Sequence, residues 1–303
     1  MLMLLSLCLF CLSNPGDHTQ TRYIMGTWFS LQVPASTELS LVDQCFQIAS
    51  RLDRLGTTYD PQSPLSLLAA GDQQFFTLPQ AQQQELLAYL ERALVYQVET
   101  NGAFHPATQK RPFPDHTVLL ESLNAVKQGR LVPVGWDLGG MLKGTAIDQM
   151  VTFLQSNQVP WALVNGGGDL RWYGRAQKIM VRMPGDQEQD APLFWVSAEQ
   201  GALATSANDR RFVADDHGNS VGHIQFVVPP LGPAASQVSV FADTAEKADV
   251  WATAVFVLGV PPPQTQPDAE AQFQKYGLSV AILAQEKLNF LGVSPRQYFS
   301  DNE

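Results

Sequence analysis

The sequence is poor in cysteine, in positive charge and in long apolar runs, and each shortage excludes a class of protein. Three cysteines among 303 residues cannot build the disulfide framework of a small secreted scaffold. Two of them, Cys8 and Cys11, lie in the first apolar segment. The third, Cys45, falls on the apolar face of an expected helix, where we expect a buried thiol.

Basic residues are scarce as well. The 19 lysines and arginines are outnumbered by 29 aspartates and glutamates, which gives a formal net charge of −10 at pH 7. No basic patch offsets the repulsion of nucleic-acid phosphates, so the composition argues against a nucleic-acid partner. A polyanionic small ligand would need local neutralisation by a lysine, by backbone N–H groups or by a metal ion.

The N-terminal apolar run, MLMLLSLCLFCLS, has about the length of the core of an export signal and is too short for a typical membrane span. No lysine or arginine precedes it, and no A-x-A cleavage site follows. We expect residues 1–16 to form an atypical export leader that directs the protein to the periplasm or the outer face of the inner membrane. A misplaced start codon, with a cytoplasmic protein, is the alternative. Leu7 and Phe10 stand where a lipid-anchor signal has small residues, which argues against lipidation.

The remaining residues, 17–303, contain no repeat, charge block or long linker, so we expect one domain. Helices and strands are mixed, with several strands in succession in the second half, which favours an α+β fold. Apolar periodicity predicts helices at 36–55, 79–98, 143–157, 245–258 and 268–276, and a helix or an irregular segment near 116–127. It predicts strands at 23–33, 161–164, 170–173, 178–183, 194–197, 202–205, 223–228, 238–241 and 279–283, and a short one that ends at 136–137.

The stretch VGWDLGGMLKGTAID, residues 134–148, reads as a strand, a glycine turn and a helix start. That order leaves free backbone N–H groups and the positive helix end where an anion can bind, and Lys143 adds a mobile charge. The glycine spacing matches neither the P-loop nor the dinucleotide fingerprint. By its local pattern the stretch could equally be a plain strand-to-helix turn with an exposed lysine.

The expected helix 245–258 is mostly apolar, but Asp249 and Thr253 interrupt that character four residues apart. Their oxygens therefore lie on one face. A carboxylate in an apolar surrounding is costly unless it is paired or binds a cation, and a hard cation such as Mg²⁺ accepts this arrangement. The alternative is that Asp249 caps the helix or pairs with Lys247 or an arginine.

Two further features have a chemical and a plain interpretation. Residues 165–169, NGGGD, could hold a phosphate through successive N–H groups, or could form a hairpin turn between two strands. His223 begins an expected strand and could accept a proton at the rim of a cleft, or could be a half-exposed strand residue.

Taken together, these segments resemble the ApbE-type FAD:protein FMN transferases, in the same order along the chain from about residue 23. The similar segments are 25–27 (M-G-T), 55–68 (S-T-Y-D-P-x-S-x-L-S), 101–106 (G-G-A-F-D-P), 137–148 (D-L-x-G-x-x-K-G-x-x-x-D), 164–169 (N-x-G-G-D), 204–206 (A-T-S), 223–224 (H-I) and 248–259 (A-D-x-x-A-T-A-x-x-x-L-G).

The resemblance implies an α+β, T-fold-like architecture with an FAD cleft between two α/β subdomains. It also implies Mg²⁺-dependent cleavage of FAD, release of AMP, and attachment of FMN to a Thr or Ser hydroxyl of a membrane-associated or exported redox protein. Carried over by position, the FAD contacts are Met25, Tyr59, Ala103, Phe104, His105, Asp137, Lys143 and Ile224. The Mg²⁺ ligands are Asp249, Thr253 and the carbonyl of Gly140, and His223 is the base. Lys143 shares in stabilising the phosphate charge.

The chain departs from the family pattern at three places. His105 stands where the family has Asp, Ala69 stands where it has Asn, and the D-P-x-T-G expected after residue 224 is absent. These departures keep three alternatives open: an FAD pyrophosphatase that yields FMN and AMP, an FAD-binding module without turnover, and an unrelated α+β protein. The flavin transferase requires Asp249 to lie beside Gly140 and Lys143 at a common cavity.

Overall fold

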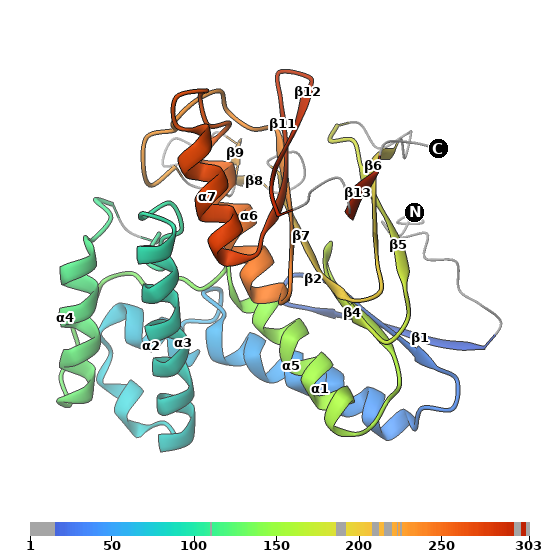
Figure 1. Ribbon diagram of the computed structural model, residues 1–303. Helices are drawn as coiled ribbons and strands as arrows, with labels where there is room; N and C mark the ends of the chain where they lie inside the picture. Colours follow the sequence, from blue (N-terminus) through green and yellow to red (C-terminus); the bar gives the residue numbers. More distant parts are fainter. Residues whose placement is uncertain are drawn as a thin grey trace.

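An eight-stranded antiparallel sheet forms the centre of the computed structural model (Figure 1), which describes residues 16–109, 111–185, 192–207, 212–214, 220–222, 224, 226–293 and 298–300. The strands are β1 (Asp17–Ile24), β2 (Thr27–Pro34), β3 (Ala162–Gly166), β4 (Asp169–Tyr173), β5 (Gln177–Arg182), β6 (Pro192–Ala198), β7 (Gly201–Ala207), β8 (Phe212–Ala214), β9 (Ser220–Gly222), β10 (Gln237–Ala242), β11 (Ser279–Ala284), β12 (Lys287–Gly292) and β13 (Phe299–Ser300). The large sheet has the order β1-β2-β3-β4-β7-β10-β11-β12, and β13-β6-β5 and β8-β9 form two smaller sheets.

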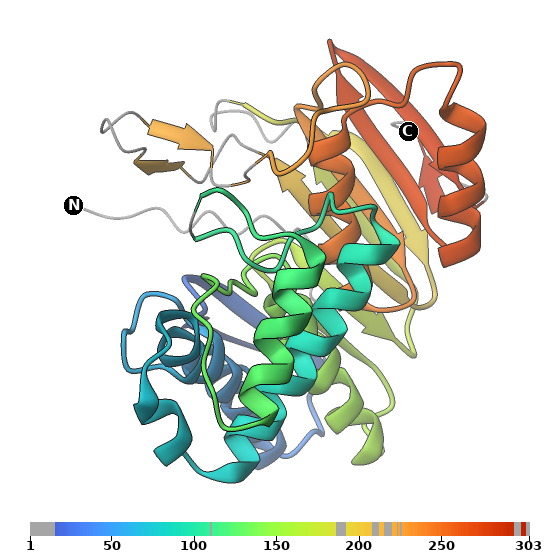
Figure 2. The same ribbon diagram turned by 90° about the vertical axis from the view of Figure 1, so that its left-hand side faces the viewer.

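The helices lie on one side of the large sheet. They are α1 (Leu39–Gly56), α2 (Pro64–Ala70), the 3₁₀ turn η1 (Gln73–Thr77), α3 (Gln80–Glu99), α4 (His116–Lys127), α5 (Leu142–Ser156), α6 (Ala245–Leu258) and α7 (Gln266–Tyr276). The helices α5 and α6 pack on the sheet, α1 packs on α5, and α3 and α4 stand side by side farther out (Figure 2). None of the helices within the described ranges is both long and apolar enough to cross a membrane.

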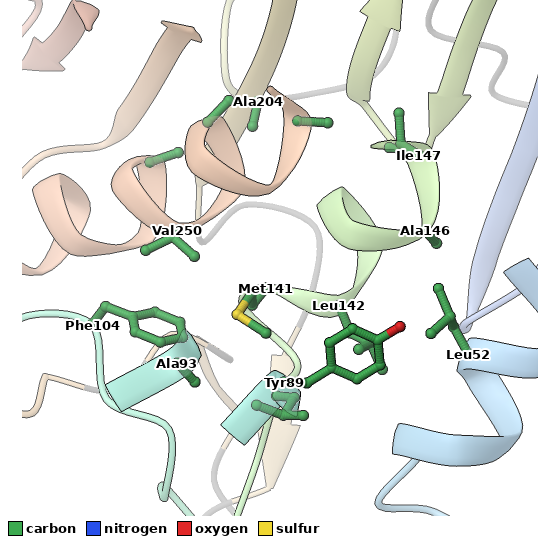
Figure 3. Close-up of a cluster of buried hydrophobic side chains, with 14 of the residues drawn as sticks. Leu52, Tyr89, Ala93, Phe104, Met141, Leu142, Ala146, Ile147, Ala204 and Val250 are labelled. Carbon is green, nitrogen blue, oxygen red and sulfur yellow. The ribbon is translucent and has the colours of Figure 1, made fainter. Parts of the chain in front are cut away.

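Two apolar cores hold these layers together. The larger core lies between the helices and the sheet. It includes Leu52 of α1, Tyr89 of α3, Met141 at the start of α5 and Val250 of α6 (Figure 3). The smaller core fills the space between the opposite face of the large sheet and the β13-β6-β5 sheet. Because both of their faces are covered, all six residues of β10 and all six of β11 are buried, and these strands lack the usual polar alternation.

The α+β class and most elements expected from the sequence are confirmed. The helix at 245–258 has the predicted bounds, the segment at 116–127 is a helix rather than irregular, and residues 165–169 turn between β3 and β4. The thiol of Cys45 is fully buried on α1, and burial raises its pKa to about 12. The expected leader lies outside the described residues, except for Gly16.

The prediction of one strand over 23–33 is wrong, because the chain reverses at Met25 and Gly26. Both residues have positive φ, 54° and 68°, and Ile24 pairs with Thr27, so β1 and β2 form a hairpin with a two-residue turn. The turn is tied to α1 by a hydrogen bond from the Met25 N–H to Asp53 Oδ2 (3.1 Å).

Other expectations also need correction. The segment before Asp137 is not a strand, and neither are Ile224 and residues 226–228, while His223 and Gln225 lie outside the described residues. The helix expected from residue 36 begins only at Leu39, and its N-cap, Glu38, makes no side-chain hydrogen bond to the helix. The periodicity missed β1 as a separate strand, β12 and α2, a short helix that Ser63 caps.

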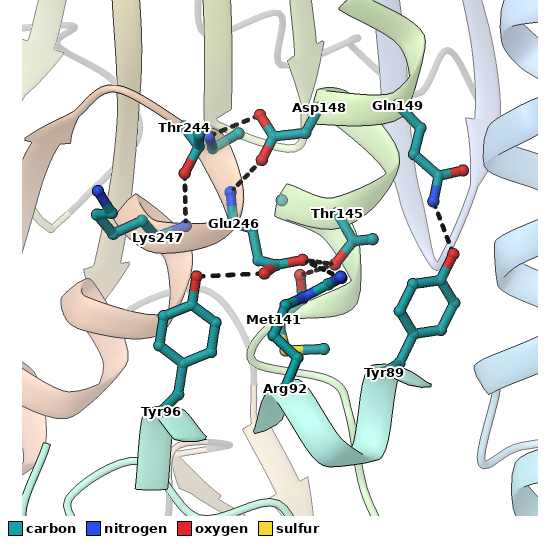
Figure 4. A network of polar contacts seen from close by, with 12 residues as sticks. Tyr89, Arg92, Tyr96, Met141, Thr145, Asp148, Gln149, Thr244, Glu246 and Lys247 are labelled. Atoms are coloured by element: carbon teal, nitrogen blue, oxygen red, sulfur yellow. Dashed lines mark hydrogen bonds and ion pairs between the residues drawn. The ribbon is translucent and has the colours of Figure 1, made fainter. Parts of the chain in front are cut away.

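A network of polar side chains joins α3, α5 and α6 beneath the sheet (Figure 4). Glu246, at the start of α6, is 7% exposed and accepts hydrogen bonds from Arg92 Nη2 (2.5 Å), Thr145 Oγ1 (2.6 Å) and the Tyr96 hydroxyl (3.2 Å). On the next turn of α5, the carboxylate of Asp148 accepts the backbone N–H groups of Ala245 and Glu246. A side chain of α5 therefore caps α6.

Gly144 allows this close approach of α5 and α6. A Cβ atom at this position would lie 2.5 Å from the carbonyl oxygen of Ala245 and 2.5 Å from the Cα of Glu246. Those neighbours are backbone atoms of another helix, so they cannot move aside without separating the two helices.

We expect Gly144→Ala to lower the free energy of unfolding by about 1–3 kcal/mol, the usual cost of overpacking a core. Chemical unfolding at equilibrium measures this change. Gly16→Ala is the matched control, because its added Cβ meets no atom within 4 Å. A Gly144→Ala variant as stable as the control would show that the two helices are not held at this distance.

Candidate functional site

A cavity of about 1190 Å³ opens where the β1–β2 turn, the N-terminal end of α5, the β3–β4 turn, β5, the end of β7 and α6 converge. The loop after α1 and the segment 103–108 complete its wall. The cavity lies at the junction between the helical layer and both larger sheets, so its wall combines helix ends, hairpin turns and strand residues.

Every described residue that the sequence assigned to the site lines this cavity. They are Met25, Tyr59, Ala103, Phe104, His105, Asp137, Gly140, Lys143, Ile224, Asp249 and Thr253. His223, the expected base, lies outside the described residues. The structure thus brings together residues from six separate stretches of the chain, while the role of each in binding or chemistry stays a prediction.

Lys143 lies between two carboxylates on the cavity wall. Its Nζ is 2.8 Å from Asp169 Oδ2, 3.1 Å from Asp249 Oδ2 and 3.3 Å from Asp249 Oδ1. The Lys143 side chain is 16% exposed, and both aspartate side chains are 7% exposed. Asp249 also accepts the backbone N–H of Gly144 (3.3 Å), so the anion at the start of α5 is a side chain of the protein itself.

The electrostatic balance of this cluster favours a further cation. Two carboxylates and one ammonium leave one net negative charge among the three side chains. Burial raises the pKa of Asp249 from 3.8 to about 6, against the opposing effect of Lys143 and with a smaller contribution from Asp169. A phosphate group entering here would be repelled until a divalent cation reverses the sign.

The donor set around Asp249 fits a hard cation such as Mg²⁺. Thr253 lies one turn further along α6, its hydroxyl is 3.5 Å from that of Ser206, and a Cβ on Gly140 would lie 3.5 Å from Thr253 Oγ1. Carboxylate, hydroxyl and backbone oxygens are the ligands that Mg²⁺ prefers, with water or phosphate oxygens in the remaining positions. Within the described ranges, no group of three His, Cys, Asp or Glu side chains could hold a metal ion.

Asp137 organises the turn that precedes α5. Its Oδ2 accepts the hydroxyl of Thr108 (2.8 Å), its Oδ1 accepts the N–H of Gly139 (2.8 Å), and its own N–H donates to Pro106 (2.8 Å). These bonds join the 103–108 segment to the turn at Gly139 and Gly140. They therefore fix the position of Phe104 relative to Gly140 in the cavity wall. A Cβ on Gly140 would approach the Phe104 ring to 3.3 Å.

The imidazole of His105 has both nitrogens engaged by backbone groups. Nδ1 accepts the N–H of Ala107 (3.1 Å), so Nε2 carries the proton that it donates to the carbonyl of Pro114 (2.9 Å). Burial lowers the pKa of His105 and favours this neutral form. His105 therefore presents a ring surface to the cavity rather than a free proton donor or acceptor.

The glycine turn 166–168 is a hairpin turn with few free donors. The N–H of Gly167 donates to the carbonyl of Trp28 (3.1 Å), and the N–H of Gly168 donates to Asn165 Oδ1 (2.9 Å). Because both groups are engaged, the plain interpretation of this segment fits better than a phosphate-binding loop. Its contribution to the site is instead Asp169, the first residue of β4.

The sequence reasoning missed an aromatic pair at the cavity. Tyr23 and Trp28 face each other across the β1–β2 hairpin with ring centroids 5.4 Å apart, and they are 63% and 48% exposed. Tyr59, on the loop after α1, is 93% exposed. The sequence did contain a signal for Trp28. Phe29, Leu31 and Val33 alternate along β2 and form its buried face, so Trp28, next to Phe29, belongs to the opposite face.

Comparisons with known proteins identify related chains. The sequence profile of the ApbE family matches residues 25–111 and 115–266. The FAD:protein FMN transferase of Treponema pallidum (strain Nichols) is 27% identical over an alignment 293 residues long. The match covers 80% of this chain and 79% of that protein.

Solved structures share the fold. The ApbE protein of Thermotoga maritima matches with a TM-score of 0.71 at 19% identity, over 94% of this chain and 100% of that one. Flavin transferase ApbE from Vibrio cholerae matches with a TM-score of 0.68 at 17% identity, over 93% and 99% of the two chains. The architecture expected from the sequence resemblance is thus confirmed.

The buried carboxylate of Asp249 leads to a testable pH dependence of stability. Between about pH 4 and 6 the folded chain without a cation holds a proton on Asp249 that the unfolded chain has released. The contribution of this group to stability therefore decreases as the pH rises through that window, by up to about 1.4 kcal/mol per pH unit. We expect Asp249→Asn, which does not titrate, to lose this dependence.

Urea unfolding of both proteins from pH 4 to 7, in EDTA, measures the two slopes. Asp243→Asn is the matched control, because its side chain is 71% exposed and pairs only with Lys247 among the contacts described. The control should follow the wild type. Equal slopes in the wild type and Asp249→Asn would contradict the raised pKa.

Proposed function

The chain belongs to the ApbE family, and we propose that it transfers FMN from FAD to a Thr or Ser hydroxyl of an acceptor protein, with Mg²⁺ and with release of AMP. The observation that carries this proposal is the Lys143–Asp169–Asp249 cluster in the wall of a large cavity. A diphosphate needs a cation and a lysine at such a place, and the flavin and adenosine parts of FAD need a cavity of this size beside it.

In the proposed reaction, the hydroxyl oxygen of the acceptor forms a bond to the phosphorus of the FMN half of FAD. The bond between that phosphorus and the bridging oxygen breaks, and AMP leaves with the electron pair. The hydroxyl proton passes to a base. The balance needs no oxidant or reductant, since one phosphoanhydride bond is exchanged for one phosphoester bond.

The residues of the chain would share this work. Lys143 donates hydrogen bonds to phosphate oxygens and stabilises the charge that builds up on them. Asp249, Thr253 and the backbone carbonyl of Gly140 would hold Mg²⁺, which lowers the cost of charge on the diphosphate when it is bound. The N–H of Gly144 orients the Asp249 carboxylate, so its position does not depend on the cation alone.

The cofactor rings would lie against the apolar part of the wall. Phe104 is held by a hydrogen bond from its N–H to Thr100 Oγ1 (3.0 Å) and packs edge-on against Tyr96. Met25, Tyr59, Ala103, His105 and Ile224 supply further surface at the cavity. Because both nitrogens of His105 are engaged, its contact with flavin or adenine would be through the ring face.

The acceptor would be a membrane-associated or exported redox protein. This part of the proposal rests on the resemblance and on the apolar leader expected at residues 1–16. Export would place the enzyme in the periplasm or at the outer face of the inner membrane, in the same compartment as such an acceptor.

Mass spectrometry of the acceptor tests the reaction directly. Incubation with FAD, Mg²⁺ and an acceptor domain should add the mass of FMN to the acceptor and release AMP. Asp249→Ala should lower the rate by about 10³-fold or more, because the cation loses its charged ligand. The control Asp243→Asn should keep the wild-type rate.

The products separate the alternatives. FMN and AMP formed without any acceptor would identify a pyrophosphatase, and tight FAD binding without either product would identify a binding module. No adduct and no AMP with any related acceptor would contradict the proposal.

His223→Ala tests the expected base. A Thr or Ser hydroxyl is a poor nucleophile until a positioned base takes its proton, which is worth about 10²–10⁴-fold in rate. We expect the variant to lose that factor in the rate of acceptor modification and to bind FAD nearly as well as the wild type. Loss of FAD binding, measured by flavin fluorescence, would instead indicate a structural role.

A further inference from the structure

Asp169 is a buried carboxylate at the site to which neither the sequence nor the proposed reaction gives a role. It is the first residue of β4, its side chain is 7% exposed, and its Oδ2 lies 2.8 Å from Lys143 Nζ, nearer than either described oxygen of Asp249. The hairpin fixes its backbone, because Asp169 pairs with Gly166 across the turn and the Gly168 N–H is held by Asn165.

The two partners of Lys143 differ in what else they do. Asp249 lies on α6, accepts the N–H of Gly144 and is followed one turn later by Thr253, and both side chains line the cavity as expected ligands of the cation. Asp169 lies across from it on the sheet. Without Asp169, Lys143 would pair with Asp249 alone, and a cation or a phosphate would meet a closed, neutral ion pair.

We propose that Asp169 is a positioning residue, which draws the ammonium of Lys143 away from Asp249 so that Lys143 can bind the diphosphate of FAD while Asp249 binds the cation. This inference rests on the proposed function and deepens it. Asp169 itself touches neither FAD nor the cation; it acts through Lys143. The rigid β3–β4 hairpin suits this role, because a positioning group must not follow the lysine when the ligand enters.

The sign of a change in FAD affinity tests the inference. If Asp169 were only a nearby negative charge, Asp169→Asn would remove repulsion and FAD would bind more tightly. If Asp169 positions Lys143, the variant loses the lysine contact and FAD binds about tenfold more weakly. Dissociation constants for FAD, from equilibrium dialysis in EDTA and again with Mg²⁺, distinguish these results. Equal or tighter binding by Asp169→Asn would overturn the inference.

A second pair of variants shows whether the effect passes through Lys143. In a Lys143→Met background the lysine cannot be positioned, so adding Asp169→Asn should no longer weaken FAD binding and should strengthen it. An equal loss in both backgrounds would overturn the inference, because Asp169 would then act on FAD by another route. Lys127→Met, which removes an exposed lysine paired with Glu91, is the matched control for the lysine change.

Asp169→Glu keeps the inference testable if the Asn variant does not fold, which thermal unfolding would reveal. The longer side chain keeps the charge but displaces the ammonium, so we expect weaker FAD binding; unchanged affinity would overturn the inference. Asp243→Asn controls for the loss of one negative charge elsewhere. Failure of the wild type to bind FAD, with or without Mg²⁺, would instead overturn the proposed function.

Discussion

The close packing of α6 against the first turns of α5 is the constraint on which the site depends. Gly144 has no side chain, so the backbone of Ala245 and Glu246 can lie against it. This contact brings the N–H of Gly144 to the carboxylate of Asp249 and places Lys143, the preceding residue, beside the same carboxylate. Asp169 then approaches from the sheet. The cluster is therefore a consequence of how two helices and one strand pack, rather than of any one loop.

Much of this could be predicted from the sequence, for physical reasons. The mostly apolar α6 stood out because it packs on the sheet and on α5, and Asp249 and Thr253 interrupted it at the spacing of one helical turn. The resemblance to the ApbE family then implied one site for Lys143, Gly140 and Phe104, and these residues line one cavity. The spacing of Asp249 and Thr253 has a local period that the sequence shows directly, whereas the grouping of the other residues came from the order of the family motifs.

The rest depends on contacts between residues far apart in the chain. The pairing of Lys143 with Asp169, and of Glu246 with Arg92, leaves no local pattern. The strand predictions were also wrong where one backbone dihedral angle changes the direction of the chain. Met25 and Gly26 reverse an otherwise continuous strand pattern, and Gly135, with φ of 68°, interrupts the apolar segment that was read as a strand before Asp137. A residue such as Met25 seldom adopts positive φ, so its type gives no signal of the reversal.

The cap of α6 has a consequence for the local unfolding of this protein. The first N–H groups of a helix are usually satisfied by residues next to it, so helix ends fray on their own. Here Asp148 on α5 holds the N–H groups of Ala245 and Glu246, and the same carboxylate pairs with Arg171 on β4 (2.8 Å). Although Thr244 caps the Lys247 N–H locally, the N–H groups of Ala245 and Glu246 are tied to α5, so we expect these two amide hydrogens to exchange together with an opening of α5 rather than by fraying of α6 alone.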